Sequence, residues 1–153
     1  MILFADTSAF VKLYFDEIGS AEMAERARGF RIALSVLAYS EVYAAFARRR
    51  RESLLSPADH ERLSSRFEED WETVIQVASS PAVLGWIPGL CADFPLRGAD
   101  AVHLAGALAL RDGGLDVAFA ASDGRLTDAA EAVGLEVFDP ARATAAGGWI
   151  AEP

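Results

Sequence analysis

The chain has 153 residues, 52% of them hydrophobic, and its 23 acidic and 14 basic side chains give a net charge of −9. This length and apolar content suit one domain whose core needs no disulfide or structural metal, and the one cysteine, Cys91, cannot form an internal disulfide. The negative charge excludes a protein that holds nucleic acid through its overall field, so any such contact must be local.

No apolar stretch of the chain reaches the ~20 residues that span a bilayer. The N-terminal run 1–15 lacks a basic leader and is interrupted by Asp6 and Lys12. We therefore expect no signal peptide, no membrane contact and a cytoplasmic protein.

Short apolar runs alternate with longer segments of helical periodicity. In chain order, we expect a strand at 2–5, helices at 9–15 and 21–28, a strand at 31–34, helices at 36–52 and 57–71, a strand at 73–77, helices at 81–93 and 99–111, a strand at 117–121, a helix at 125–133 and a strand at 136–138. This alternation predicts an α/β sandwich in which right-handed crossovers join parallel strands.

Local signals mark some of the element ends. Ser56 and Ser80 each precede a proline, the arrangement of a helix cap followed by the first helical residue. Pro88 interrupts the helix expected at 81–93, where we expect a kink or a break. We place one domain at 1–139 and a C-terminal tail at 140–153, which is loosened by glycine and proline and could pack on the domain.

Three aspartates stand at expected strand ends or helix starts. Asp6 follows the first strand, Asp123 follows the fourth, and Asp100 opens a helix that is apolar nearly all round. Ligands of a parallel α/β sheet bind beyond the carboxyl ends of the strands, and a carboxylate beside a buried helix needs a partner or a metal. Each aspartate could instead cap its helix or complement the helix dipole, but three such coincidences together are much less expected.

Glu41, in the helix expected at 36–52, is less conspicuous. On a helical wheel it falls nearly opposite the apolar side, so the local pattern alone predicts a solvent-exposed side chain. Only its place one helix turn after a strand favours a functional role.

Four sequence blocks, in order, resemble one family. They are residues 6–14 (DTSAFVKLY), 40–42 (SEV), 96–105 (LRGADAVHLA) and 121–126 (ASDGRL). Each block alone is a short degenerate pattern, but together they resemble PIN-domain proteins, specifically the VapC-type toxins of toxin-antitoxin systems, over nearly the whole chain. The resemblance implies a single PIN-like α/β/α sandwich with a central, mainly parallel five-stranded sheet. Pro88 and Gly89 depart from it, because the family usually has an unbroken helix there.

The resemblance also implies a site and an activity. The family's acidic quartet falls on Asp6, Glu41, Asp100 and Asp123, and Ser8 matches its small hydroxyl residue beside the first aspartate. Family members hold Mg²⁺ or Mn²⁺ in this pocket, hydrolyse RNA, are silenced by a cognate antitoxin and form homodimers. The expected function is a metal-dependent endoribonuclease, the toxin of a type II toxin-antitoxin system, with an RNA substrate and a VapB-like antitoxin as partners.

Carboxylates suit this chemistry. Mg²⁺ takes oxygen ligands in an octahedral shell and keeps several waters, and one or two such ions can activate a water and stabilise the leaving oxygen of a phosphodiester. We expect Asp6 and Asp100 to bind the metal directly, and Glu41 and Asp123 to bind it directly or through water.

RNA must also meet positive charge near these acids. The run 48–51 consists of four arginines, and Arg48 lies two helix turns after Glu41 on the same side, with the small Ala45 between them. We expect Arg48 and Arg49 to bind nucleic acid. Two alternatives stay open for this run: a solvated helix end that favours cations, and a contact with the antitoxin.

Other interpretations have less support. His103 is more readily explained as a hydrogen-bonded core histidine than as a metal ligand. The chain has no glycine-rich phosphate loop with a lysine, no Gly-x-Ser-x-Gly motif and no Cys/His metal spacing. A phosphoacceptor receiver domain would need a lysine after a late strand, whereas Lys12 is the only lysine, and a phosphatase would need aspartate in place of Ser8. The remaining alternative is a PIN-like module that binds RNA or protein without cutting.

Overall fold

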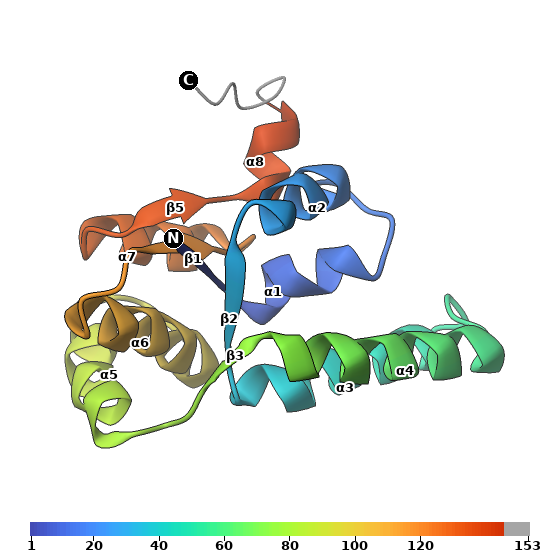
Figure 1. The fold of residues 1–153 in the computed structure, drawn as a ribbon, viewed down its shortest axis with the longest axis horizontal. Coiled ribbons are helices and arrows are strands. Elements are labelled where there is room, and N and C mark those ends of the chain that lie inside the picture. Colours follow the sequence, from blue (N-terminus) through green and yellow to red (C-terminus); the bar gives the residue numbers. More distant parts are fainter. Residues whose placement is uncertain (146–153) are drawn as a thin grey trace.

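The computed structural model describes residues 1–145, which contain one sheet of five parallel strands (Figure 1). The strands are β1 (Ile2–Ala5), β2 (Arg31–Ser35), β3 (Ile75–Val77), β4 (Val117–Ala120) and β5 (Glu136–Phe138). Their order across the sheet is β3-β2-β1-β4-β5, and every neighbouring pair is parallel. The expected fold class, an α/β sandwich around a parallel five-stranded sheet, is confirmed.

Helices connect the strands and cover both faces of the sheet. They are α1 (Thr7–Phe10), the 3-10 turn η1 (Val11–Leu13), α2 (Ser20–Arg28), α3 (Leu37–Arg51), α4 (Pro57–Thr73), α5 (Pro81–Asp93), α6 (Gly98–Asp112), α7 (Gly124–Ala132) and α8 (Pro140–Ala145). Helices α3 and α4 lie side by side as a long pair at the lower right of Figure 1, while α5 and α6 pack together at its lower left.

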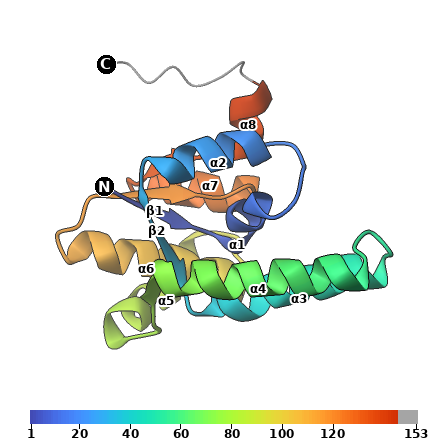
Figure 2. The ribbon, with the colours of Figure 1, turned by 45° about the vertical axis from the view of Figure 1, so that its right-hand side comes forward.

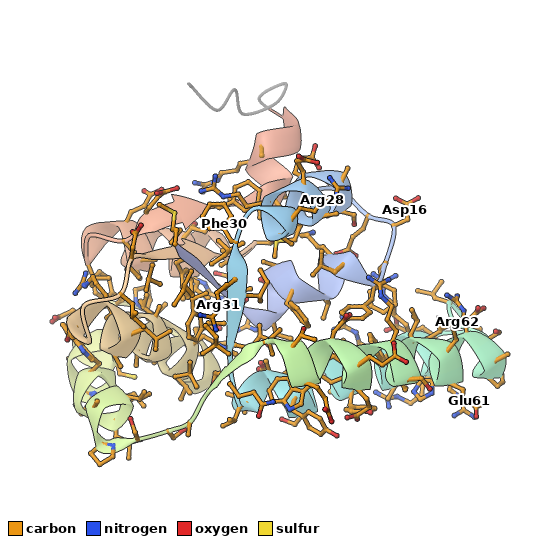
Figure 3. The ribbon with its side chains drawn as sticks, viewed as in Figure 1. Asp16, Arg28, Phe30, Arg31, Glu61 and Arg62 are labelled. Atoms are coloured by element: carbon orange, nitrogen blue, oxygen red, sulfur yellow. The ribbon has the colours of Figure 1, made fainter. Side chains whose placement is uncertain are left out.

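Alternate residues of the central strand face two separate cores. Ile2 and Phe4 belong to the core formed with α5, α6 and α7, whereas Leu3 and Ala5 belong to the core formed with α1 to α4. Side chains from both helix layers fill the space on either side of the sheet (Figure 3). A strand buried on both faces has a continuous apolar sequence, which is why β1 is visible in the sequence.

The close packing of α6 on β1 depends on Gly106. A Cβ atom at this position would lie 2.8 Å from Cζ of Phe4. The Phe4 ring cannot easily give way, because it is fully buried and its centroid lies 5.9 Å from that of Phe119. Gly106 therefore sets how near the sheet α6 can lie.

Aromatic side chains join α3 to α4. Phe46 of α3 and Phe67 of α4 are fully buried, with ring centroids 6.2 Å apart. Nearer the surface, the hydroxyls of Tyr39 and Tyr43 both donate to Oε1 of Glu68, the first at 2.7 Å. These contacts fix the position of α3, which carries one of the predicted site residues.

Some local expectations differ from the structure. The helix expected at 9–15 is divided between α1 and η1. Of the kink or break expected at Pro88, the break is wrong, because α5 is continuous through this residue. Proline removes the hydrogen bond to the carbonyl of Leu84, but both residues lie on the solvent side of the helix, Leu84 being 51% exposed, so water can satisfy that carbonyl.

The two predicted serine caps are confirmed, since Ser56 accepts from the N–H of Asp59 at 3.0 Å and Ser80 from that of Val83 at 3.5 Å.

Part of the predicted tail forms α8, which packs against α2 (Figure 2). Gly19, just before α2, lies so near that a Cβ atom there would be 2.7 Å from the carbonyl carbon of Pro140. The rest of the predicted tail, 146–153, lies outside the described residues. Within residues 1–145, no helix is long and apolar enough to cross a membrane.

Candidate active site

The predicted site lies at the switch point of the sheet. The central strand β1 has β2 and β3 on one side and β4 and β5 on the other, and ligands of open parallel sheets bind in the crevice at such a point. Asp6, the first residue after β1, is 6% exposed, and its N–H donates to the carbonyl of Ala120 on β4 at 2.8 Å. This bond ties the carboxyl ends of β1 and β4 together at Asp6.

Asp6 also caps helix α1. Its Oδ2 accepts hydrogen bonds from the backbone N–H of Ser8 at 3.0 Å and from Ser8 Oγ at 2.5 Å. Ser8 Oγ in turn accepts from the N–H of Ser122, just beyond β4, at 3.0 Å. Capping thus uses one carboxylate oxygen of Asp6, and the other, Oδ1, lies 3.6 Å from Nε2 of His103.

Glu41 reaches the same place from α3. Its Oε2 accepts a hydrogen bond from Thr7 Oγ1 at 2.5 Å and lies 2.8 Å from Nε2 of His103. The side chain is 30% exposed, so the helical-wheel expectation of a solvent-exposed residue is wrong. The reason is that α1 and α6 both contact α3. Burial raises the pKa of Glu41, but the hydrogen bonds from His103 and Thr7 and the charge of His103 outweigh it and lower the pKa overall.

His103 lies at the centre of the cluster formed by Asp6, Glu41 and Asp100. It is 1% exposed, and its Nε2 contacts Glu41 and approaches Asp6. Burial disfavours the imidazolium, but the hydrogen bond to Glu41 and the charges of Asp6, Glu41 and Asp100 together raise the pKa of His103. The interpretation of a buried, hydrogen-bonded histidine is confirmed, but its partners are carboxylates of the site.

The sequence interpretation missed Thr7 and placed His103 in the core. Two signals were present: His103 is one turn after Asp100 on the same side of α6, and Thr7 lies directly after Asp6. Neither signal points to Glu41, which is 34 residues from Thr7 and 62 from His103.

Asp100 is the third residue of α6 and is half-buried. Its Oδ2 accepts a hydrogen bond from the N–H of Arg97 at 3.0 Å, a helix-capping contact. Its charge nevertheless acts on His103, one helical turn further along. Asp100 therefore belongs to the cluster through its electric field while one of its oxygens caps the helix.

Asp123 caps α7. Its Oδ1 accepts from the N–H groups of Arg125 at 3.0 Å and Leu126 at 3.3 Å, and its Oδ2 lies 3.6 Å from the Arg125 guanidinium. Burial raises the pKa of Asp123, but the two N–H groups and Arg125 lower it overall. Within residues 1–145, Asp123 forms no hydrogen bond with the other three acids, and it is joined to them through the neighbouring Ser122, which donates to Ser8.

The cluster offers oxygen ligands but no closed metal cage. In the described part of the chain, no three acidic, histidine or cysteine side chains are spaced to hold a metal ion. Mg²⁺, however, is usually bound by one or two carboxylates together with waters and substrate phosphates. Asp6 and Asp100 each keep one oxygen outside their capping contacts.

The buried hydroxyl of Ser122 has no hydrogen-bond partner among residues 1–145, so a water or ligand would satisfy it. The donor set therefore fits a hydrated divalent ion.

The two arginines expected to bind nucleic acid have different surroundings. Arg48 is exposed and lines a groove that also includes Glu41. Arg49 pairs with Glu17 at 2.6 Å, and its guanidinium lies 3.9 Å from the ring centroid of Phe15. Arg49 thus ties α3 to the segment between η1 and α2.

Comparison with known proteins identifies the family. Residues 3–132 match the model of the PIN domain. The chain belongs to the PIN-domain family. It is 39% identical over 137 residues to Ribonuclease VapC45 of Mycobacterium tuberculosis (strain CDC 1551 / Oshkosh) and to Ribonuclease VapC49 of Mycobacterium tuberculosis (strain ATCC 25618 / H37Rv), with 89% of this chain and 94% of each relative covered. The VapC-type resemblance of the four sequence blocks is confirmed.

Solved structures share this PIN-domain fold at low sequence identity. FitAcB from Neisseria gonorrhoeae matches with a TM-score of 0.65 and 17% identity, covering 92% of this chain and 98% of that chain. VapBC2 from Rickettsia felis, whose structure includes a DNA fragment from the VapBC2 promoter, matches with a TM-score of 0.64 and 13% identity, covering 91% of this chain and 98% of that chain. At such identities the likeness shows the fold alone.

Proposed function

We propose that this PIN-domain protein is a divalent-metal-dependent endoribonuclease and the toxin of a type II toxin-antitoxin system. The observation that carries the proposal is the gathering of Asp6, Glu41 and Asp100 around His103 at the switch point of the sheet. A module that only binds has no need to bring partly buried carboxylates together, because their desolvation costs free energy. The names of the relatives, Ribonuclease VapC45 and Ribonuclease VapC49, support the same activity.

Four acids are assigned to the metal. Asp6 and Asp100 would bind Mg²⁺ or Mn²⁺ directly, and Glu41 and Asp123 would bind it directly or through water. When bound, the ion supplies an activated water for attack on the phosphodiester and positive charge for the leaving oxygen.

Other side chains of the protein position these acids. Ser8 holds Asp6 between the ends of β1 and β4. Thr7 and His103 hold one oxygen of Glu41, and its Oε1 has no partner within residues 1–145. A carboxylate held in this way is preorganised, so little ordering remains to be done when substrate arrives. His103 also offsets the repulsion among the acids.

An antitoxin that blocks this site would silence the enzyme. One solved structure of similar fold is a toxin-antitoxin complex from Klebsiella pneumoniae, and we extend this arrangement to a VapB-like partner of the present protein. A homodimer and a cytoplasmic location complete the proposal.

The test of the nuclease is Asp6→Asn. Asparagine keeps an oxygen that can cap α1 but removes the charge, so the variant should fold normally and fail to cut structured RNA in Mg²⁺ or Mn²⁺. Asp139→Asn is the matched control, because Asp139 also follows a strand and accepts from a helix N-terminus, the N–H of Ala141, at 2.9 Å. The control should cut like wild type. Equal cutting by all three proteins would contradict the nuclease assignment and favour a non-cleaving module.

The toxin assignment has a separate test in cells. Expression without a partner should arrest bacterial growth, and Asp100→Ala should relieve the arrest at an equal level of soluble protein. Normal growth of cells that express the wild-type protein would refute the toxin role. It would not bear on the nuclease activity, which the cleavage assay with Asp6→Asn tests.

A further inference from the structure

A groove on α3 begins at Glu41 and extends toward the C-terminal end of the helix. It has a volume of about 310 Å³ and is lined by Glu41, Ala44, Ala45, Arg48 and Arg51. These residues follow the spacing i, i+3, i+4, i+7 and i+10, so they share one side of α3. The two small alanines leave space between the carboxylate and the guanidinium groups.

Arg48 and Arg51 stand in the last turn of α3, where their charges suit the helix dipole, but within residues 1–145 no side chain pairs with them. Both side chains are exposed. Arg50 is also exposed, but it lies nine residues after Glu41, which places it about 180° around the helix from the groove. Two unpaired cations therefore face the groove and one faces away.

The arginines of the groove lie at a distance from the acids that can be estimated along α3. With a rise of ~1.5 Å per residue, Arg48 lies about 10 Å and Arg51 about 15 Å beyond Glu41 along the helix. A phosphate held there is therefore not the one attacked at the acids but one further along the same strand. Arginine suits this task, because its planar guanidinium can donate two parallel hydrogen bonds to phosphate oxygens.

The lining of the groove favours a nucleic-acid backbone over a protein segment. A docked peptide anchors itself through apolar or aromatic side chains that enter pockets, whereas the apolar lining here consists of two alanines. The net charge of −9 repels RNA from the molecule as a whole. Unpaired arginines in a groove that begins at Glu41 can provide the local attraction needed to overcome this repulsion.

We propose that this groove binds backbone phosphates of the RNA strand on one side of the cleavage point, with Arg48 and Arg51 as the contacts. The proposal rests on the proposed nuclease function and adds to it the path of the substrate, which leaves the acids along α3 toward its C-terminal end. Arg51 thereby takes the place that the sequence interpretation gave to Arg49.

The test measures RNA binding in the Asp6→Asn background, so that the probe stays intact. The probe is a fluorescein-labelled single-stranded RNA of mixed sequence in Mg²⁺, and anisotropy gives Kd at several salt concentrations. Arg48→Gln and Arg51→Gln should each weaken binding roughly three- to fivefold, the range of an exposed ion pair. Each should also reduce the slope of log K against log salt by about 0.7, the value for one phosphate contact with a single strand.

Arg50→Gln is the matched control, because it removes the same charge from the opposite side of the same helix and should leave Kd near that of the parent. Ala44→Glu, which places a carboxylate in the groove while keeping both arginines, should weaken binding as well. Thermal melts of all variants, compared with the Asp6→Asn parent, check that none has lost its fold.

The possible outcomes distinguish a failure of the groove proposal from a failure of the proposed nuclease function. If Arg48→Gln and Arg51→Gln bind the probe no worse than Arg50→Gln while wild type cuts RNA, the groove proposal fails and the proposed function stands. If wild type neither binds nor cuts RNA, the proposed function itself fails. If Arg48→Gln loses a VapB-like antitoxin but keeps the probe, the groove belongs to the protein partner and the proposal is overturned.

Discussion

Asp6, Asp100 and Asp123 each use one carboxylate oxygen to hold a backbone N–H at a helix start. The cap and the site residue, weighed as alternatives in the sequence, are therefore compatible roles of the same side chain. A carboxylate that caps a helix is held in one rotamer, and that rigidity favours a preorganised site. Asparagine separates the two roles, because it can keep the cap while it loses the charge.

At Thr7, the prediction concerns the placement of Glu41. Thr7→Val keeps the shape of the side chain but removes the hydroxyl that donates to Glu41. Hydrogen bonds to charged groups contribute about 1.5 kcal/mol or more, so the cleavage rate at saturating RNA should fall about tenfold. Thr7→Ser, which keeps the donor, should retain most of the rate. Wild-type kcat for Thr7→Val would show that Thr7 does not position Glu41.

Among the elements, α6 is the one whose placement matters most to the site, since it carries Asp100 and His103. Gly106→Ala brings a methyl group against the buried ring of Phe4. Overpacking costs ~1–3 kcal/mol, and the better helix propensity of alanine returns only ~1 kcal/mol, so the free energy of unfolding should fall and cleavage with it.

Gly85 of α5 provides the control, because nothing lies within 4 Å of a Cβ atom there. Gly85→Ala should gain about 0.5–1 kcal/mol of stability. Urea unfolding compares the two variants, and equal stability would show that α6 does not lie this close to β1.

We expect the stability of the α3–α4 pairing to depend on pH through Glu68. Hydrogen bonds from Tyr43 and Tyr39 lower its pKa in the folded protein. A lowered folded pKa stabilises the fold above the unfolded pKa, and this contribution is lost as the pH falls through the folded pKa. Glu68→Gln should therefore be less stable than wild type at pH 7, and the difference should shrink toward pH 3.

Urea unfolding at several pH values measures this difference. Glu61→Gln, at an exposed position of the same helix (Figure 3), should show no such pH dependence. A difference for Glu68→Gln that stays constant down to pH 3 would mean that its ionised form is not held by the tyrosines.

For the whole molecule, bound metal should add stability. Excess Mg²⁺ or Mn²⁺ stabilises the fold by RT ln(1 + [L]/Kd), about 2.7 kcal/mol at a hundred times Kd. Asp100→Asn can keep the contact with the N–H of Arg97, but it should gain less from metal than wild type does in thermal melts at pH 7.5.

In chelator, Asp100→Asn should melt at or slightly above the wild-type temperature, because it removes one of several like charges. The gain is small, since His103 already offsets part of the repulsion. If metal shifted neither protein and the variant melted far below wild type in chelator, Asp100 would be a structural cap.

The sequence by itself determined the elements and the chain positions of the acids. Strands buried on both faces leave continuous apolar runs, and the residues that follow them lie at the carboxyl edge of the sheet, so Asp6 could be placed from local pattern alone. Glu41 could not be placed from local pattern, because a helical wheel shows only that it lies opposite the apolar side of α3 and not that α1 and α6 contact this helix. The family resemblance of the four sequence blocks was needed to select it. The break expected at Pro88 is absent, because a rule drawn from local sequence does not register that the freed carbonyl of Leu84 lies on the solvent side of α5, where water can reach it.

Only the tertiary structure decided which side chains meet. Thr7 and His103 converge on Glu41 from α1 and α6, which are far apart in sequence, and no periodicity within either helix encodes that contact. Similarly, Arg48 and Arg49 are neighbours in one run, but Glu17 takes up the charge of Arg49 and leaves that of Arg48 available. The physical reason is that hydrogen bonding and charge pairing depend on distance in space, whereas a sequence pattern reports only the phase of a residue within its own element.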